Sequence, residues 1–304
     1  MKFGVMLPYG LPGGSGWADP RFARAAVQRA EQLGFESVWA GEHVAFRADY
    51  APNYPYSPDG KTPLPLQTCY TDPLVQLGWA AAFTETIKLG TGVVVLPQRQ
   101  PLHLAKEAAT IDLLSGGRLI MAVGLGWQRE EYEALGMPFE GRARRMDESI
   151  AALRALWAED AATSKGEHIR FEQMLSYPKP LRNDIPLLIG GHSMAAARRA
   201  GALGDGLFAL VSQPSEVAPL RAAMRDAAAA AGRDPSTMEI TVGRAPDEAG
   251  VKPADVLDTV KEYEAAGVDR IVLFRVFEQD TAEMNRFLDS FAEDIIQPCA
   301  ADVR

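Results

Sequence analysis

One histidine in this sequence is well placed for proton transfer. His43 follows Trp39-Ala40-Gly41-Glu42, a short stretch that reads as the end of a buried strand. An imidazole can donate or accept a proton near neutral pH, so one interpretation is a general acid–base group. The other is a structural histidine that bonds a neighbouring carboxylate and holds the following loop. Glu42 is a candidate for that carboxylate, although adjacent residues on an extended chain point in opposite directions.

A glycine pair at positions 190 and 191 is suited to binding an anion. Gly190-Gly191-His192-Ser193 separates an apolar stretch from a helix expected over Met194–Leu203. The first amides of a helix have no partner within the helix, and glycines let a phosphate approach the backbone. The competing interpretation is a plain tight turn in which Ser193 caps the helix. The sequence supports both interpretations.

A further glycine cluster, Gly124-Leu125-Gly126-Trp127, is not a dinucleotide-binding fingerprint. The pattern G-x-G-x-x-G requires glycine at position 129, which is arginine here. These glycines instead suit a planar ligand that lies against the backbone, with Trp127 either as a wall of the pocket or as a core residue. Candidate substrate-binding residues are Tyr50, Tyr54, Tyr56, Tyr70 and Arg275. For Arg275, a structural ion pair is the alternative.

Several other functions lack their motifs. The four histidines show no H-E-x-x-H spacing, so we expect no metal site, and neither a G-x-S-x-G elbow nor a P-loop occurs. A net charge of -9 argues against nucleic acid as a partner. No apolar stretch is long enough to span a membrane, and the one at the N-terminus is too short for a signal peptide. Cys69 and Cys299 stand far apart, which favours reduced thiols and a cytoplasmic protein.

The elements that must position these residues alternate along nearly all 304 residues. Most expected strands are continuous apolar stretches, as in a parallel sheet that is buried on both faces. They are Phe3–Leu7, Ser37–Ala40, Ile87–Leu96, Leu119–Val123, Leu187–Gly190, Gly206–Leu210, Glu239–Val242 and Arg270–Phe274. Asp19-Pro20, Asp72-Pro73, Pro101 and Pro253 are typical helix starts. The alternation predicts an α/β fold, a (β/α)8 TIM barrel in one domain over residues 1–304, with a doubly wound sheet as the alternative.

Two long segments interrupt the alternation and predict insertions. Ala45 to Thr71 follows the second strand and contains all the candidate tyrosines. A loop of that length in a compact domain is usually functional, and in a barrel it would overhang the C-terminal mouth. Thr163 to Asn183, before the fifth strand, reads as a small hairpin.

The order of the motifs resembles the bacterial luciferase-like monooxygenase superfamily. The resemblance is carried by Trp39 to His43, Gly90 to Pro97, Leu113 to Leu119, Gly124 to Gly136, and the glycines at 190, 191, 204 and 206. It covers nearly all of the chain to about residue 210. The insert Tyr56-Ser57-Pro58-Asp59-Gly60 is most similar to the branch that uses the deazaflavin coenzyme F420.

The resemblance implies a barrel that holds a flat redox ring in its mouth. It implies that His43 lies beside the ring, that Gly126 and Trp127 line the ring's pocket, and that Gly190, Gly191, His192 and Ser193 meet the cofactor phosphate. It also implies a non-proline cis peptide against the ring, which by register is Gly92–Val93. Gly92 stands where family members often have Ser, Thr or Cys.

Three functions follow from the resemblance. The first is hydride transfer between F420 and a small organic substrate, with His43 as the proton donor or acceptor. The second is an FMN-dependent monooxygenase that receives reduced flavin from a partner reductase. The third is a barrel that binds flavin or deazaflavin without turnover. The resemblance also implies a homodimer, and no motif identifies the substrate.

Overall fold

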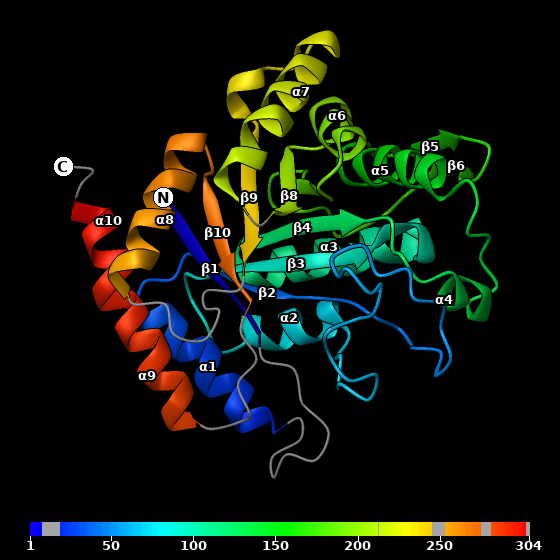
Figure 1. Cartoon of the computed structure of the whole chain (residues 1–304). Coiled ribbons are helices and arrows are strands. Elements are labelled where there is room, and N and C mark those ends of the chain that lie inside the picture. Colours follow the sequence, from blue (N-terminus) through cyan, green and yellow to red (C-terminus); the bar gives the residue numbers. More distant parts are fainter. Residues whose placement is uncertain (8–18, 212, 245–252, 275–280, 302–304) are drawn as a thin grey trace.

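Eight parallel strands form a closed barrel at the centre of the molecule, in the order β1-β10-β9-β8-β7-β4-β3-β2 (Figure 1). The computed structural model describes residues 1–7, 19–211, 213–244, 253–274 and 281–301. The barrel strands are β1 (Lys2–Met6), β2 (Ser37–Ala40), β3 (Lys88–Val95), β4 (Leu119–Gly124), β7 (Leu187–Gly190), β8 (Gly206–Leu210), β9 (Glu239–Arg244) and β10 (Arg270–Leu273). The predicted TIM barrel is confirmed, and the doubly wound alternative is wrong.

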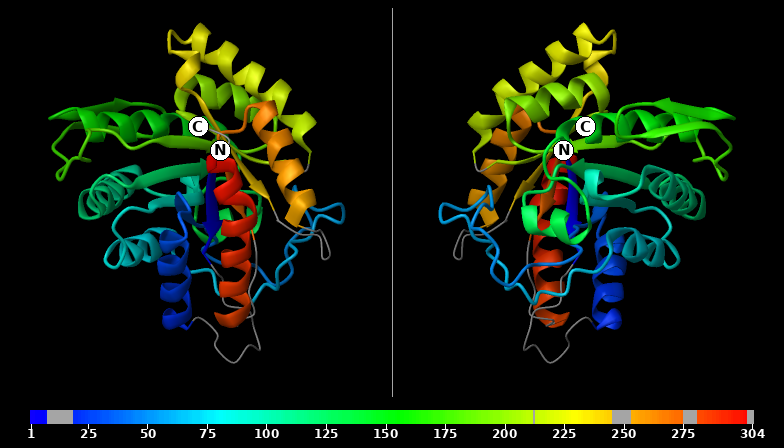
Figure 2. Two further views of the ribbon diagram at one scale, coloured as in Figure 1. Left: turned by 90° about the vertical axis from the view of Figure 1, so that its left-hand side faces the viewer. Right: turned by 90° about the vertical axis from the view of Figure 1, so that its right-hand side faces the viewer.

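Helices follow the strands and surround the barrel (Figures 1 and 2). They are α1 (Pro20–Gln32), α2 (Pro73–Ala81), α3 (Pro101–Ser115), α4 (Arg129–Ala134), α5 (Arg142–Ala158), α6 (Met194–Leu203), α7 (Val217–Ala230), α8 (Pro253–Ala266), α9 (Thr281–Phe291) and α10 (Gln297–Ala301). Short 3-10 turns lie at Leu96–Gln98, Pro214–Glu216 and Pro235–Thr237, and a π-helical turn at Ala292–Ile296 joins the last two helices.

The predicted helix starts are present because aspartates cap them. The side chain of Asp19 accepts a hydrogen bond from the amide of Arg21, and that of Asp72 accepts from the amides of Leu74 and Val75. Each cap satisfies amides that the helix itself leaves open. The sequence therefore determines where α1 and α2 begin.

The indole of Trp39 occupies the interior of the barrel. Its Nε1 donates a hydrogen bond of 2.8 Å to Ser37 Oγ, and it packs with Met6, Ile120, Ala122, Leu188, Phe208 and Val272. Glycines on both neighbouring strands make room for it, since a Cβ at Gly4 would lie 2.6 Å from the indole and one at Gly90 would lie 2.4 Å from it. The interior is a packed core and not a channel.

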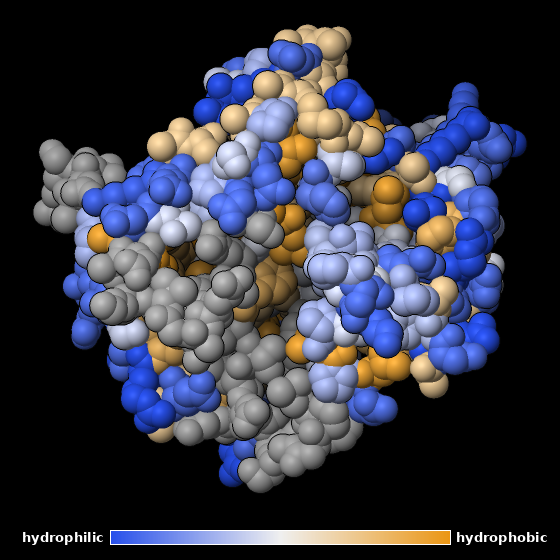
Figure 3. Space-filling model, viewed as in Figure 1, coloured by the Kyte–Doolittle hydropathy of each residue, from blue (hydrophilic) through white to orange (hydrophobic). Residues whose placement is uncertain are grey.

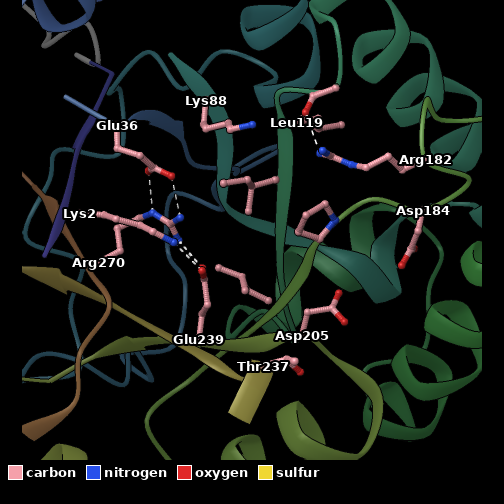
Figure 4. A pocket seen from close by; sticks show the side chains of 14 residues that line it. Lys2, Glu36, Lys88, Leu119, Arg182, Asp184, Asp205, Thr237, Glu239 and Arg270 are labelled. Carbon is pink, nitrogen blue, oxygen red and sulfur yellow. Dashed lines mark hydrogen bonds and ion pairs between the residues drawn. The ribbon is translucent and has the colours of Figure 1, made fainter. Parts of the chain in front are cut away.

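Buried ion pairs close the amino-terminal end of the barrel. The guanidinium of Arg270, 2% exposed, lies 2.8 Å from Glu36 and 3.4 Å from Glu239. A pocket of about 450 Å³ opens here, and Figure 4 shows Arg270 between the two carboxylates that line it. Other lining carboxylates, Asp184 and Asp205, are bonded by arginines. Barrel enzymes react at the opposite end, so we interpret this pocket as structural.

Both predicted insertions are present. Residues 41–72 connect β2 to α2 without a helix or an extended strand. Before β7, the strands β5 (Ala162–Lys165) and β6 (Arg170–Met174) pair antiparallel, and this hairpin projects from the barrel (Figure 2).

Candidate functional site

The carboxyl end of β3 forms part of the barrel mouth. The peptide bond between Gly92 and Val93 is cis, and the register of β3 on β4 shifts between Thr91 and Val94. The half-buried side chain of Val93 extends into space that two glycines leave open. A Cβ at Gly124 would lie 2.8 Å from Val93 Cγ2, and one at Gly190 would lie 2.9 Å from Val93 Cγ1. Both glycines are therefore needed for the close packing around Val93.

His43 lies directly after β2 at this same end and is surrounded by aromatic rings. Its ring centroid is 4.2 Å from that of Phe46, 5.3 Å from that of Tyr70 and 5.8 Å from that of Trp127. The contacts with Tyr70 and Trp127 are edge-to-face, an arrangement that aromatic pairs favour. The structure thus brings His43 and Trp127 together from the ends of β2 and β4.

The predicted tyrosines extend this aromatic cluster across the mouth. Tyr50 and Tyr54 meet Trp127 edge-to-face at centroid distances of 5.4 and 5.3 Å. Tyr54 also meets Tyr56 at 5.5 Å, and Tyr56 reaches the ring of His192 at 5.0 Å. We call these rings, with His43, Phe46, Tyr70 and Trp127, the aromatic wall. The wall runs from the end of β2 to the loop after β7.

Two adjacent glutamates of α4 explain why the long loop lies over the mouth. Glu131 Oε1 accepts hydrogen bonds from the amides of Val44 and Ala45, at 2.7 and 3.2 Å. Glu130 Oε1 accepts one from the amide of Ala51 at 2.8 Å. Figure 1 shows α4 beside this loop. An acidic first turn is ordinary in a helix, so nothing in the sequence indicates that these carboxylates bind another loop.

The carboxylate next to His43 is Glu131 and not the predicted candidate Glu42. Glu131 Oε2 lies 3.4 Å from His43 Nδ1. Glu42 instead accepts hydrogen bonds from the amide of Val95 at 2.6 Å and from Arg99 Nε at 2.7 Å. Adjacent side chains on the extended chain point apart, which is why Glu42 turns toward β3 while His43 faces the mouth.

Trp127 is a half-buried wall residue and not part of the core. Its Nε1 is buried without a hydrogen-bond partner among the described residues. The preceding Gly126 has φ of +68°, and a Cβ there would lie 2.6 Å from Val95 Cγ1. Only glycine suits both the backbone conformation and the space, so Gly126 determines where Trp127 stands.

The segment from Gly190 to Ser193 is a tight turn with a helix cap, and it also leaves helix amides open, so both interpretations made from the sequence apply to it. Ser193 caps α6, because its Oγ accepts a hydrogen bond of 3.2 Å from the amide of Ala196. Gly191 has φ of +141° and donates its amide to the carbonyl of Phe208 at 2.9 Å. The geometry of a helix leaves the amides of Met194 and Ala195 without intrahelical acceptors. The turn is therefore capped and still offers amides to an anion.

Burial raises the pKa of two phenols of the aromatic wall. Desolvation raises the pKa of both Tyr54 and Tyr70 above the usual value of 10.0. Both are hydrogen-bond donors at neutral pH. The hydroxyl of Tyr50 also acts as an acceptor. It accepts a hydrogen bond of 3.0 Å from the amide of Thr62 and so stabilises the loop.

These features fit a flat, phosphate-bearing ring. Val93 offers an apolar contact, Trp127 Nε1 is a donor with no partner among the described residues, and the first turn of α6 has amides without intrahelical acceptors. Figure 3 shows apolar surface in a depression near the middle of the molecule, with polar surface to its right.

Arg275 lies outside the described residues. In the described ranges, no group of three or more His, Cys, Asp or Glu could hold a metal ion, and every helix is too short or too polar to cross a bilayer.

Several known proteins are similar to this chain in sequence. A protein of Mycobacterium tuberculosis, itself uncharacterised, is 32% identical over 287 residues, which are 91% of this chain and 96% of that protein. An F420-dependent glucose-6-phosphate dehydrogenase of Kineococcus radiotolerans is 29% identical over 233 residues, 74% of this chain and 63% of that protein. The oxygenase component of a flavin-dependent trigonelline monooxygenase of Acinetobacter baylyi is 33% identical over 161 residues, 52% of this chain and 39% of that protein.

Solved structures share the fold over almost the whole chain. The monooxygenase RslO1 from Streptomyces bottropensis has a TM-score of 0.82 at 23% identity, covering 98% of this chain and 99% of that one. An F420-dependent secondary alcohol dehydrogenase in complex with an F420-acetone adduct has a TM-score of 0.76 at 20% identity, covering 97% and 98%. The model of the luciferase-like monooxygenase family matches residues 1–246. The chain therefore belongs to the luciferase-like monooxygenase family.

Proposed function

We propose that the protein is an oxidoreductase that transfers hydride between coenzyme F420 and a small organic substrate at the mouth of the barrel. The observation that carries the proposal is the meeting of His43 and Trp127 within the aromatic wall, 5.8 Å apart, at the end of the barrel where α6 also begins. Relatives named as F420-dependent, a glucose-6-phosphate dehydrogenase and a secondary alcohol dehydrogenase, support it.

Each group of residues at the site has its own proposed role. When bound, the coenzyme accepts or donates the hydride. His43 accepts or donates the accompanying proton, which balances charge as the hydride moves. Gly92, Val93, Gly126 and Trp127 form the seat for the ring, and the open amides after Gly190, Gly191, His192 and Ser193 bind its phosphate. Tyr50, Tyr54, Tyr56 and Tyr70 surround the substrate and exclude water, which leaves substrate positioning as the main source of rate.

A second candidate is an FMN-dependent monooxygenase. The flavin-dependent relative and the monooxygenase of the same fold favour it. The same residues would then hold the isoalloxazine ring, and a separate reductase would supply reduced flavin. For the F420 reaction, a second F420-dependent enzyme would regenerate the coenzyme.

Titration of the purified protein with each coenzyme distinguishes the two candidates. We expect F420 to bind, as measured by the change in its fluorescence, and FMN to bind more weakly. Binding of FMN without binding of F420 would replace the first candidate by the second. Binding of neither would contradict both.

The role of His43 is tested by a matched pair of variants. His43→Gln is expected to slow substrate reduction by about 10²- to 10⁴-fold, as for loss of an acid–base group. The control is His103→Gln, because His103 is an exposed histidine in the first turn of α3. Equal rates in wild type and His43→Gln would remove His43 from the chemistry and favour a barrel that only binds its cofactor.

The expected homodimer also stays a proposal. Large apolar side chains are exposed on α2 and α3, among them Val75 and Leu114, each 73% exposed. Burial of such surface against a second copy would be favourable. The two helices pack on each other, so one interface could cover both.

A further inference from the structure

We propose that Glu131 is a positioning residue for His43, which holds the imidazole with its proton on Nδ1 and leaves Nε2 for the reaction. The inference rests on the proposed function and deepens it. Glu131 lies beside His43 and accepts hydrogen bonds from the two residues that follow it, so its part in the reaction would act through His43.

The geometry around Glu131 carries the inference. Its side chain is 1% exposed, and its Oε2 lies 3.4 Å from His43 Nδ1, a buried nitrogen that has no hydrogen-bond partner in the described residues. The distance is longer than an ordinary N–H···O bond, and such bonds often tighten only when the substrate is bound. Gln98 Nε2 donates to the same Oε2 at 3.3 Å and fixes its direction.

The same carboxylate fixes the backbone on which His43 stands. Oε1 accepts the amides of the two residues that follow His43, so one side chain holds both the loop and the ring. Glu131 also lies four residues after Trp127 in the chain. The carboxylate that contacts His43 therefore belongs to the same short segment as Trp127.

The proposed role requires a negative charge on the carboxylate of Glu131. Burial alone would raise its pKa, but His43, the amide of Ala45 and the side chain of Gln98 outweigh burial, so the pKa of Glu131 lies below its usual value. The carboxylate is therefore ionised at neutral pH. An ionised acceptor at Nδ1 selects the tautomer with the proton there and stabilises the imidazolium that forms when Nε2 takes up a proton.

Imidazole ¹⁵N NMR measures the tautomer directly, without turnover. In the full-length protein labelled at histidine, the resonances of His43 are assigned by their loss in His43→Gln. We expect the Nδ1-protonated form to dominate in the neutral ring of the wild type. A dominant Nε2-protonated form in the wild type would overturn the proposal, and this measurement needs no variant of Glu131.

The variant Glu131→Gln removes the charge and keeps an oxygen that can accept the loop amides. We expect it to lower the fraction of the Nδ1-protonated form and to reduce kcat by about 10- to 100-fold, with smaller changes in KM and in coenzyme affinity. The matched control is Glu130→Gln, since Glu130 holds the same loop through Ala51 but has no contact with His43. The control is expected to leave both the tautomer and kcat unchanged.

A double-mutant cycle separates positioning from mere support of the fold. In the His43→Gln background, Glu131→Gln is expected to change kcat less than about twofold, because the group it acts through is absent. Equal losses in both backgrounds would overturn the inference. Absence of turnover in the wild type with either coenzyme would contradict the proposed function alone, since the tautomer is read without activity.

Discussion

The substitution Gly124→Ala tests whether the floor of the mouth is as tightly packed as the structure indicates. The new Cβ would lie 2.8 Å from Val93 Cγ2, about 1 Å closer than ordinary carbon–carbon contact. Valine is stiff at χ1, and its other methyl, Cγ1, already lies in the space that Gly190 leaves open. Rotation of Val93 therefore gives no easy relief.

The expected cost is that of overpacking a well-packed core, about 1–3 kcal/mol. Part of it lowers the free energy of unfolding. The rest appears as weaker coenzyme binding if Val93 is pushed into the mouth, and 1.4 kcal/mol on binding would raise Kd about tenfold. Val93→Ala removes both methyls and is expected to restore stability and affinity in the Gly124→Ala background.

The assay is a double-mutant cycle of Gly124→Ala and Val93→Ala, with denaturant unfolding and coenzyme titration on all four proteins. The coupling free energy between the two positions is expected to be about 1–2 kcal/mol. Additive effects, with no rescue by Val93→Ala, would refute the packing argument. Gly78→Ala on α2 is the control, since a Cβ there meets nothing closer than 3.7 Å.

Two further predictions concern the base of the barrel and its outer helices. Burial acts to raise the pKa of Glu36, but Arg270 outweighs it, so the pKa of Glu36 in the folded protein lies below the usual 4.5. The ionised Glu36 therefore makes its full contribution to the free energy of unfolding above pH 4.5, and this contribution is lost as the pH falls through the pKa of the folded protein. Glu36→Gln is expected to lower the unfolding free energy at pH 7 by about 3 kcal/mol. The difference from wild type should shrink below pH 4.5, and an equal difference in urea unfolding at pH 7 and pH 3 would contradict the ion pair's role. If the proposed homodimer forms through α2 and α3, Leu114→Lys is expected to give a monomer in light scattering coupled to gel filtration, and a wild type that is monomeric would refute that interface.

Much of the barrel could be predicted because its determinants are local. Strands buried on both faces must be continuously apolar, and an aspartate before a proline, as at Asp19 and Asp72, satisfies helix amides that nothing else would. The boundaries moved by one or two residues only. The expected strand Ile87–Leu96, for example, is β3 over Lys88–Val95, because Leu96 begins a 3-10 turn.

The contacts of the site depend on distant segments and were less accessible to sequence reasoning. The sequence could name the tyrosines of the long loop but not which rings meet. It could not show that Glu131, in the ordinary-looking helix start Arg129-Glu130-Glu131, is buried against a loop 87 residues earlier in the chain. Its role appears only when the ends of β2 and β4 are placed at the same mouth. The pairing of Gly124 and Gly190 with Val93 is equally a property of the closed barrel.

The anchoring of the long loop at its first residues has a consequence for how members of such a fold can diverge. The loop is held on α4 by hydrogen bonds from the amides of Val44, Ala45 and Ala51, which follow His43 closely in the chain. Beyond Ala51, the chain can change in length or composition while the hydrogen bonds from Val44 and Ala45 to Glu131 keep the backbone next to His43 in place. Selectivity for a new substrate can thus be acquired by rebuilding the distal part of the loop, with His43 left where it is.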